Sequence, residues 1–207
     1  MRTAGWQVAS ARLALAGPLV LLLVSISGCK VNVSKSQNGE DKNVDIETPV
    51  GGIHVSQDAN ARDTGLPVYP GAQEKQKGDH DSNRANVNIT SGFFGVKVVA
   101  LEFVSNDSPD KVAAYYRDQL KKYGGILECH TDNPHGDAGN VNVEMGKNQG
   151  KSDNKLACEK DHGATLELKV GTKDNQHIVS ISPQSTGKGT DFALVFVQTR
   201  EGDKGTI

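Results

Sequence analysis

The chain has 207 residues and a formal net charge of −2, from 23 lysines and arginines against 25 aspartates and glutamates. The basic residues are scattered along the chain, which argues against the massed positive charge of a nucleic-acid-binding protein. After a leader of 28 residues, the remaining length suits one hydrophobic core of ordinary size, so we expect a single domain.

The first 28 residues have the pattern of an export signal. Arg2 and Arg12 lie in a start without acidic residues, residues 13–26 form an apolar run, and small residues follow. The run is shorter than the roughly 20 apolar residues that a transmembrane helix requires, whereas it fits the core of a signal peptide. We therefore expect residues 1–28 to be removed on export.

The signal ends in Ile26-Ser27-Gly28-Cys29, which resembles the lipobox of bacterial lipoprotein precursors. The resemblance covers residues 1–29 and implies that Cys29 takes a diacylglycerol and becomes the new N-terminus. Acyl chains such as palmitate contribute about 0.8 kcal/mol per buried methylene, so several of them hold a protein firmly on a membrane. Lys30 follows where enterobacterial inner-membrane lipoproteins have Asp, which favours the periplasmic side of the outer membrane in a Gram-negative cell. The alternative is a buried cysteine in an apolar helix.

Residues 29–43 are predicted to form a flexible tether. This segment is mostly Ser, Asn, Gln, Lys and Asp, and such a composition does not bury enough apolar surface to offset the entropy of ordering. In residues 44–55, apolar and polar residues alternate on both sides of Gly51-Gly52, which predicts two short strands around a turn. We assign residues 44–62 to this hairpin, which must dock or stay loose because an isolated hairpin is marginal.

A globular domain is predicted for residues 63–200, followed by a polar tail at residues 201–207. Its first strands are expected around Val87 and Ile89 and over residues 96–104, where the chain is apolar enough to be buried on both faces. The turn region SGFFG separates these two adjacent strands.

Phe93 and Phe94 lie between two glycines at the expected hairpin tip. If exposed, they would form a contact point for a partner or for the membrane interface. We expect them in the core instead, because aromatic residues make up 5% of the chain and few others are available to fill it.

Residues 109–123 are predicted to form a helix. Ser108 is a suitable N-cap, Pro109 suits the first helical position, and Gly124 ends the helix. Four apolar residues at steps of four, four and three form one stripe: Val112, Tyr116, Leu120 and Tyr123. We expect this stripe to pack on a sheet. A helix lying on a lipid surface is the alternative, which the narrow stripe disfavours.

The strands expected after the helix are residues 126–131, 141–145, 156–159, 164–170, 177–182 and 191–199. The last of these carries large apolar residues on both faces, which is typical of a central strand. Together, these elements predict an α+β domain: a largely antiparallel sheet with one amphipathic helix packed on it.

Two passages, DTGLPVYPGA at residues 63–72 and FVSNDSPDKVAAYYRDQLKKYG at residues 103–124, resemble a recurring pattern in uncharacterised bacterial lipoproteins and secreted proteins. In that pattern, a YPGA segment precedes strands and a helix of the form DSPxxVxxYY. The shared features are turns and a capped helix, so the resemblance supports the fold and implies no activity.

The cysteines divide into one plus two. With Cys29 assigned to lipid, Cys129 and Cys158 remain in a compartment that is oxidising if the cell is Gram-negative. Each lies in an expected strand on the side of an apolar neighbour, Leu127 or Leu156, so both should point towards the same core. We predict a disulfide between Cys129 and Cys158; the alternative is two buried free thiols. Neither lies in a Cys-x-x-Cys pair, so zinc or redox chemistry has little support.

Three short motifs resemble those of penicillin-binding enzymes and class A β-lactamases, in the same order. They are Ser108-Pro109-Asp110-Lys111, Ser152-Asp153-Asn154 and Lys188-Gly189-Thr190. Those enzymes need a larger domain than residues 108–190 supply, and the third motif has its last two residues reversed. We therefore interpret Ser108 as a helix cap rather than a nucleophile.

His130 and His135 flank the sequence TDNP, and with Asp132 and Asp137 they offer imidazole and carboxylate ligands for a metal. Loop residues of these types usually face water, and the sequence has neither a zinc-protease helix motif nor a regular calcium loop. We expect no metal, no cofactor and no catalytic residue.

The sequence thus predicts a membrane-anchored extracytoplasmic lipoprotein that acts as a non-enzymatic binding or scaffolding module of the cell envelope. Its partners are then the membrane, through the lipid, and an envelope protein, a glycan or a small ligand. The alternative is an envelope hydrolase whose residues meet only in the fold, with His130, Asp132 and His135 as the first candidates.

Overall fold

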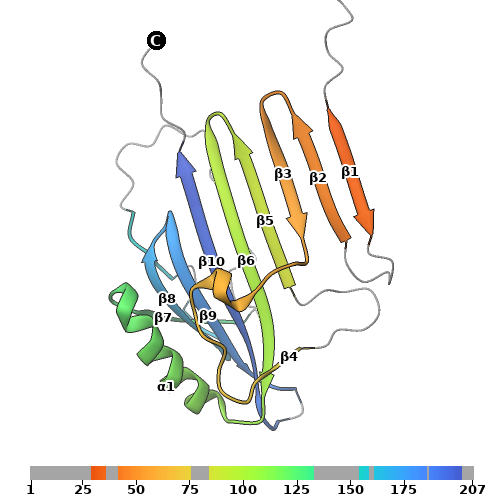
Figure 1. The fold of residues 1–207 in the computed structure, drawn as a ribbon. Coiled ribbons are helices and arrows are strands. Elements are labelled where there is room, and N and C mark those ends of the chain that lie inside the picture. Colours follow the sequence, from red (N-terminus) through yellow and green to blue (C-terminus); the bar gives the residue numbers. More distant parts are fainter. Residues whose placement is uncertain are drawn as a thin grey trace, which may run out of the picture.

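The computed structural model describes residues 29–35, 42–75, 84–132, 154–158, 161–185 and 187–201. Its main element is an antiparallel sheet in the order β1-β2-β3-β5-β6-β10-β9-β8-β7, with the short β4 paired to β6 (Figure 1). The strands are β1 Lys30–Lys35, β2 Lys42–Thr48, β3 Gly51–Ser56, β4 Gln73–Glu74, β5 Arg84–Ser91, β6 Phe94–Ser105, β7 Leu127–Thr131, β8 Thr165–Thr172, β9 Asn175–Pro183 and β10 Thr190–Glu201.

One α-helix, α1 at Pro109–Leu120, crosses one face of this sheet over β8 and β9 and continues into a 3₁₀ turn at Lys121–Tyr123 (Figure 1). A second 3₁₀ turn, Ala61–Thr64, packs over β6 and β10. No helix among the described residues is both long and apolar enough to cross a bilayer. The structure is thus consistent with the predicted α+β class, although the sheet dominates it.

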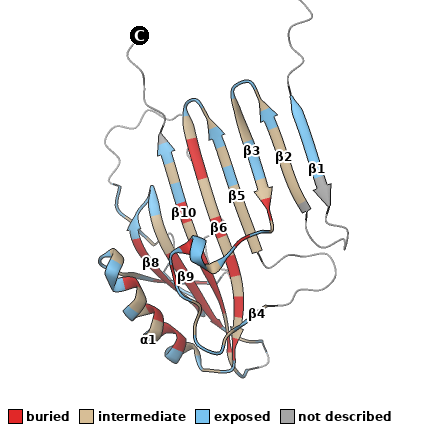
Figure 2. Cartoon of the chain, in the orientation of Figure 1, coloured by how far each residue is buried: buried red, intermediate tan, exposed pale blue. Residues whose placement is uncertain are grey.

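The helix forms where the sequence predicts it. Ser108 has the extended backbone of an N-cap and Pro109 occupies the first turn, although the Ser108 hydroxyl makes no capping hydrogen bond. Val112, Tyr116 and Leu120 are fully buried against the sheet, as Figure 2 shows by the red patches on the inner side of α1. The predicted stripe therefore builds the core.

The core beneath α1 consists of aligned rows across four strands. Phe103 of β6 is paired with Phe192 of β10, which is paired in turn with Ile181 of β9. The rings of Phe103 and Phe192 are stacked with centroids 5.4 Å apart, and Tyr116 of α1 lies 5.6 Å from Phe192. Such aromatic pairs add about 0.5–1.5 kcal/mol beyond the area they bury.

Strand β10 is buried on both faces, which confirms the predicted central strand. Phe192 and Leu194 face α1, whereas Ala193, Val195 and Val197 are buried on the opposite face. That opposite face also holds a buried ion pair within β8, in which Lys169 Nζ lies 2.7 Å from Glu167 Oε2.

One predicted strand is wrong, and another is not tested. Residues 154–158 are irregular, so the strand expected at residues 156–159 is not found in them; the backbone bond from Lys173 N–H to the Asn154 carbonyl joins them to the β8–β9 turn without a strand ladder. The strand expected at residues 141–145 lies outside the described residues.

The expected tether at residues 29–43 is also wrong in part, because residues 30–35 form β1. Val31 and Val33 of β1 lie opposite Ile46 and Val44 of β2, and such cross-strand apolar pairs stabilise the pairing of two strands. The composition of the segment as a whole is polar, so it did not predict this strand. The strands of the expected hairpin are found as β2 and β3, but the turn is Pro49-Val50 rather than Gly51-Gly52. β3 docks on β5, so the hairpin belongs to the same sheet as the domain that follows.

Candidate functional site: the outer half-sheet and the anchor end

The sheet extends beyond α1 as a flat region that we call the outer half-sheet: β1, β2, β3, β5 and residues 94–98 of β6. Figure 1 shows these strands on the side away from the helix. Its two faces have opposite character, because side chains alternate along each strand and the strands are aligned in register.

One face, which we call the valine–isoleucine face, carries two rows of β-branched apolar residues. The rows are Val31, Ile46, Ile53, Ile89 and Val96, and then Val33, Val44, Val55, Val87 and Val98. The edge strand is the most exposed part of the first row: Val31 of β1 is 63% exposed, compared with 39% for Ile53 of β3, and Val96 of β6 is buried. An apolar surface therefore opens towards the edge strand.

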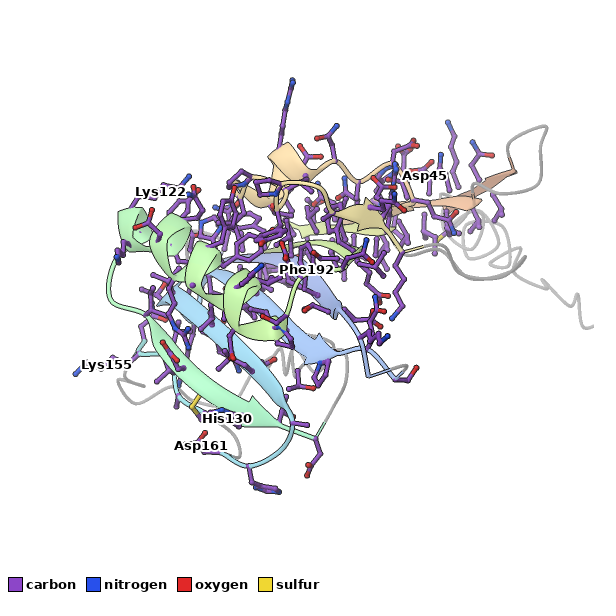
Figure 3. The ribbon with its side chains drawn as sticks, turned by 90° about the horizontal axis from the view of Figure 1, so that it is seen from below. Asp45, Lys122, His130, Lys155, Asp161 and Phe192 are labelled. Atoms are coloured by element: carbon purple, nitrogen blue, oxygen red, sulfur yellow. A yellow bond between two sulfur atoms is a disulfide. The ribbon has the colours of Figure 1, made fainter. Side chains whose placement is uncertain are left out.

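The opposite face is polar along the same strands. One row of it comprises Asn32, Asp45, His54, Asn88 and Lys97. Within this row, His54 Nδ1 is in contact with Asp45 Oδ1 across β2 and β3. Asp45 is labelled in Figure 3, well away from Phe192 in the core. The outer half-sheet is thus amphipathic in cross-section.

Two turns lie side by side at one end of the outer half-sheet: Pro49-Val50 between β2 and β3, and Gly92-Phe93 between β5 and β6. The Gly92 N–H donates to the Val50 carbonyl at 3.4 Å. An open groove between the turns is lined by Pro49, Val50, Gly51, Thr90, Ser91, Gly92 and Phe93. Val50 is 71% exposed and Phe93 is 82% exposed, so the end is apolar.

The expectation that Phe93 and Phe94 fill the core is therefore wrong for Phe93, and Phe94 is only half-buried. The cause is local. The Ser91 hydroxyl accepts hydrogen bonds from the N–H groups of Phe93 and Phe94, at 3.1 and 3.0 Å, and fixes a tight turn beyond the last β5–β6 pair. No element of the described chain covers a ring at that position.

Cys29, the predicted lipid acceptor, is a free and exposed cysteine. It directly precedes β1, whose first residue, Lys30, is paired with Glu47 near the end of β2. The Pro49-Val50 turn begins two residues after Glu47, and Gly51 of β3 is paired with Ser91 of β5. Cys29 therefore lies at the same end of the sheet as both apolar turns, which we call the anchor end.

The predicted disulfide between Cys129 and Cys158 is present, with Cα atoms 5.6 Å apart. Cys129 is buried in β7, whereas Cys158 is half-buried in the irregular segment. The pairing is thus confirmed, but the reasoning from two strands was wrong for Cys158. The bond fixes residues 154–158 to the edge of the sheet.

The candidate catalytic residues are found in two separate, exposed pairs. His130 Nδ1 lies 3.4 Å from Asp161 Oδ1, and His162 Nε2 lies 3.3 Å from Asp132 Oδ2. Figure 3 shows His130 and Asp161 close to the disulfide. Within the part of the chain that the structure describes, no three residues of the types His, Cys, Asp and Glu gather to bind a metal. His135 and Asp137 lie outside the described residues.

The motifs similar to those of β-lactamases have structural roles where they are described. Lys111 Nζ lies 2.9 Å from Asp107 Oδ1, and this hydrogen bond raises the pKa of Lys111, so the amine stays protonated and is not available as a general base. Thr190 Oγ1 donates to the Asp107 carbonyl at 2.7 Å and so joins β10 to the start of α1. Ser152 and Asp153 lie outside the described residues.

One cluster that the fold brings together has no signal in the sequence. The His177 ring of β9 stacks on Tyr123 with centroids 3.9 Å apart and lies 5.0 Å from Phe196 of β10. Its Nδ1–H donates to the Thr64 carbonyl at 2.7 Å, since a carbonyl only accepts. Burial lowers the pKa of His177, although this hydrogen bond acts in the other direction. The cluster fixes the 3₁₀ turn at Ala61–Thr64 to the sheet.

No protein-family model, curated protein or solved structure matches this chain. We therefore infer function from the geometry. The most distinctive features outside the core are the exposed valine–isoleucine face, the apolar turns and the cysteine at the same end.

Proposed function

We propose that this chain is an extracytoplasmic lipoprotein, anchored through Cys29, whose outer half-sheet serves as a non-enzymatic binding or scaffolding module for an envelope protein. The observation that carries the proposal is the position of Cys29, exposed and directly before the edge strand β1. A lipid on this cysteine holds the sheet close to the membrane instead of at the end of a tether.

The valine–isoleucine face supports a protein partner. It is built of β-branched side chains, and Val31 and Val33 expose more than half of their surface. Contiguous exposed apolar surface of this kind is typical of protein–protein contact. Among the described strands, β1 is the last on its side of the sheet, and an edge strand accepts a further strand through its unpaired backbone groups. A partner strand on β1 would extend both the ladder and the apolar face.

Fatty-acid labelling of cells tests the anchor. We expect wild-type protein to incorporate labelled palmitate and the Cys29→Ala variant to lose the label and retain residues 1–28, because the thiol is the lipid acceptor. Ser27→Ala, a small change two residues earlier, is the matched control and should be labelled. Equal label in wild type and Cys29→Ala contradicts the proposal.

Site-specific photo-cross-linking tests the binding face. A photoreactive residue at Val33 should form an adduct with a discrete envelope protein, whereas the same residue at Asn32, its neighbour on the opposite face of β1, should not. Adducts of equal yield from both positions, or from neither, contradict a specific partner on this face.

A further inference from the structure

The large apolar side chains that are exposed in the described part of the chain are concentrated at the anchor end. They are Val31, Val33, Val50, Ile53 and Phe93. Val50 and Phe93 form the tips of the two turns, and Val31 and Ile53 lie in the first apolar row behind them. Only Val33 lies in the second row.

The register places these tips near Cys29. Strands β1, β2, β3 and β5 follow one another in the sheet, with a spacing of about 4.8 Å between neighbours. The Gly92-Phe93 turn joins β5 and β6 and is therefore about 14–19 Å from the start of β1 across the sheet, and the Pro49-Val50 turn is closer. A lipid on Cys29 would enter the bilayer beside both turns.

We propose that the Pro49-Val50 and Gly92-Phe93 turns insert into the membrane interface beside the Cys29 lipid, so that the outer half-sheet stands upright with its strands pointing away from the phospholipid surface. This inference rests on the proposed lipid anchor. It adds a second membrane contact, which fixes the orientation of the sheet and keeps the valine–isoleucine face accessible from the side.

The backbone of the turns suits an apolar environment. In lipid, each polar backbone group needs a partner within the protein. The N–H groups of Phe93 and Phe94 donate to the Ser91 hydroxyl, the Gly92 N–H donates to the Val50 carbonyl, and the Val50 N–H donates to the Thr48 hydroxyl at 3.4 Å. Insertion therefore leaves these donors satisfied.

The charge pattern also fits an interface. No charged residue lines the groove between the turns. Among the described strands, the charged residue nearest the tips is Glu201 of β10, which is paired with Phe94. The next cross-strand row behind it comprises Lys30, Glu47, Gly52, Thr90, Gly95 and Arg200. This row lies two to three residues from Val50, or about 7–10 Å at 3.3 Å per residue. Interfacial segments bury their apolar side about 5–10 Å deep, which brings both rows to the level of the lipid headgroups.

Tryptophan fluorescence of the lipidated protein in vesicles tests the inference. Trp6 is the one tryptophan of the chain and lies in the expected signal, so the processed protein carries none. We would introduce a single tryptophan by Phe93→Trp or by Val50→Trp, and both exposed positions tolerate the larger ring. Two controls are Ser185→Trp, in the β9–β10 turn at the opposite end of the sheet, and Val33→Trp, on the second row of the valine–isoleucine face.

The vesicles contain phosphatidylcholine brominated on its acyl chains, which quenches only inserted rings. We expect both tip variants to lose most of their fluorescence and to emit at shorter wavelength, with Ser185→Trp and Val33→Trp unaffected. If the protein is lipidated and bound to vesicles but the tip variants are not quenched, the turns do not insert, while the proposed lipid anchor stands. Strong quenching of Val33→Trp overturns the inference in favour of a sheet lying flat on its apolar face. If the intact mass lacks the lipid, the proposed anchor and this inference fail together.

Discussion

The Tyr116 hydroxyl is predicted to hold the YPGA segment on the helix. The Tyr69 N–H donates to Tyr116 Oη at 3.0 Å, and the Tyr116 hydroxyl donates to the Pro67 carbonyl at 3.2 Å. Tyr116→Phe removes both bonds, keeps the ring, and leaves a backbone donor and a backbone acceptor without their partner. Such a loss costs about 1–3 kcal/mol. For a domain of this size, each kcal/mol corresponds to about 2–4 °C in melting temperature.

Tyr115→Phe is the matched control, because it deletes the same atom from the neighbouring residue. Tyr115 is half-buried, its ring packs edge-on against Tyr69 and Tyr116, and no described residue hydrogen-bonds its hydroxyl. In urea unfolding followed by far-ultraviolet circular dichroism, we expect a lower midpoint for Tyr116→Phe and a nearly unchanged midpoint for Tyr115→Phe. Equal midpoints for the two variants would refute the role of the Tyr116 hydroxyl.

Three further predictions concern stability. Burial lowers the pKa of His177 below its unfolded value, so the stability contributed by the neutral ring is fully present above about pH 6.5 and is lost as pH falls through the folded pKa. His177→Phe should therefore make the free energy of unfolding depend less on pH over this window. A pH dependence equal to that of the wild type would contradict this. Replacing both Cys129 and Cys158 by serine should lower the free energy of unfolding by roughly 3–4 kcal/mol in urea, since the disulfide closes a long loop. Reductant should then have no effect on the stability of the variant. Equal stability of the variant and the oxidised wild type argues against this. Gly51→Ala should destabilise the β2–β3 hairpin, because the new Cβ would lie 2.2 Å from a β5 carbonyl oxygen. Gly92→Ala is the control, since its Cβ meets nothing within 4 Å. Amide hydrogen exchange in β2 and β3 should become faster only for Gly51→Ala.

Local patterns were enough to predict the helix and the central strand. Both depend on residues close in sequence: the stripe of Val112, Tyr116 and Leu120 between a cap and a glycine, and the apolar residues on both sides of β10. The partners of the disulfide followed from a count, because one of three cysteines had been assigned to lipid. The geometry around Cys158 did not follow, since an alternation over three residues does not define a strand.

The candidate site was beyond sequence reasoning because it depends on register. Val31 and Val33 lie in a polar segment, and they form part of an apolar face only because β1 pairs with Ile46 and Val44 of β2. The exposure of Phe93 depends on the Ser91 turn, and that turn lies beside Val50 only because β3 pairs with β5. Composition favoured a core position for Phe93, and tertiary structure placed it at the anchor end.

The proposed lipid anchor is tested by the intact mass of the wild-type protein extracted from membranes. We expect the mass of residues 29–207 with the two cysteines of the disulfide oxidised, plus the mass of acyl chains and their glyceryl group on Cys29. Hydrolysis of ester-linked lipid should then remove the acyl chains of the diacylglyceryl group. A mass that corresponds to the unmodified chain, or to one that retains residues 1–28, contradicts the lipid anchor at Cys29.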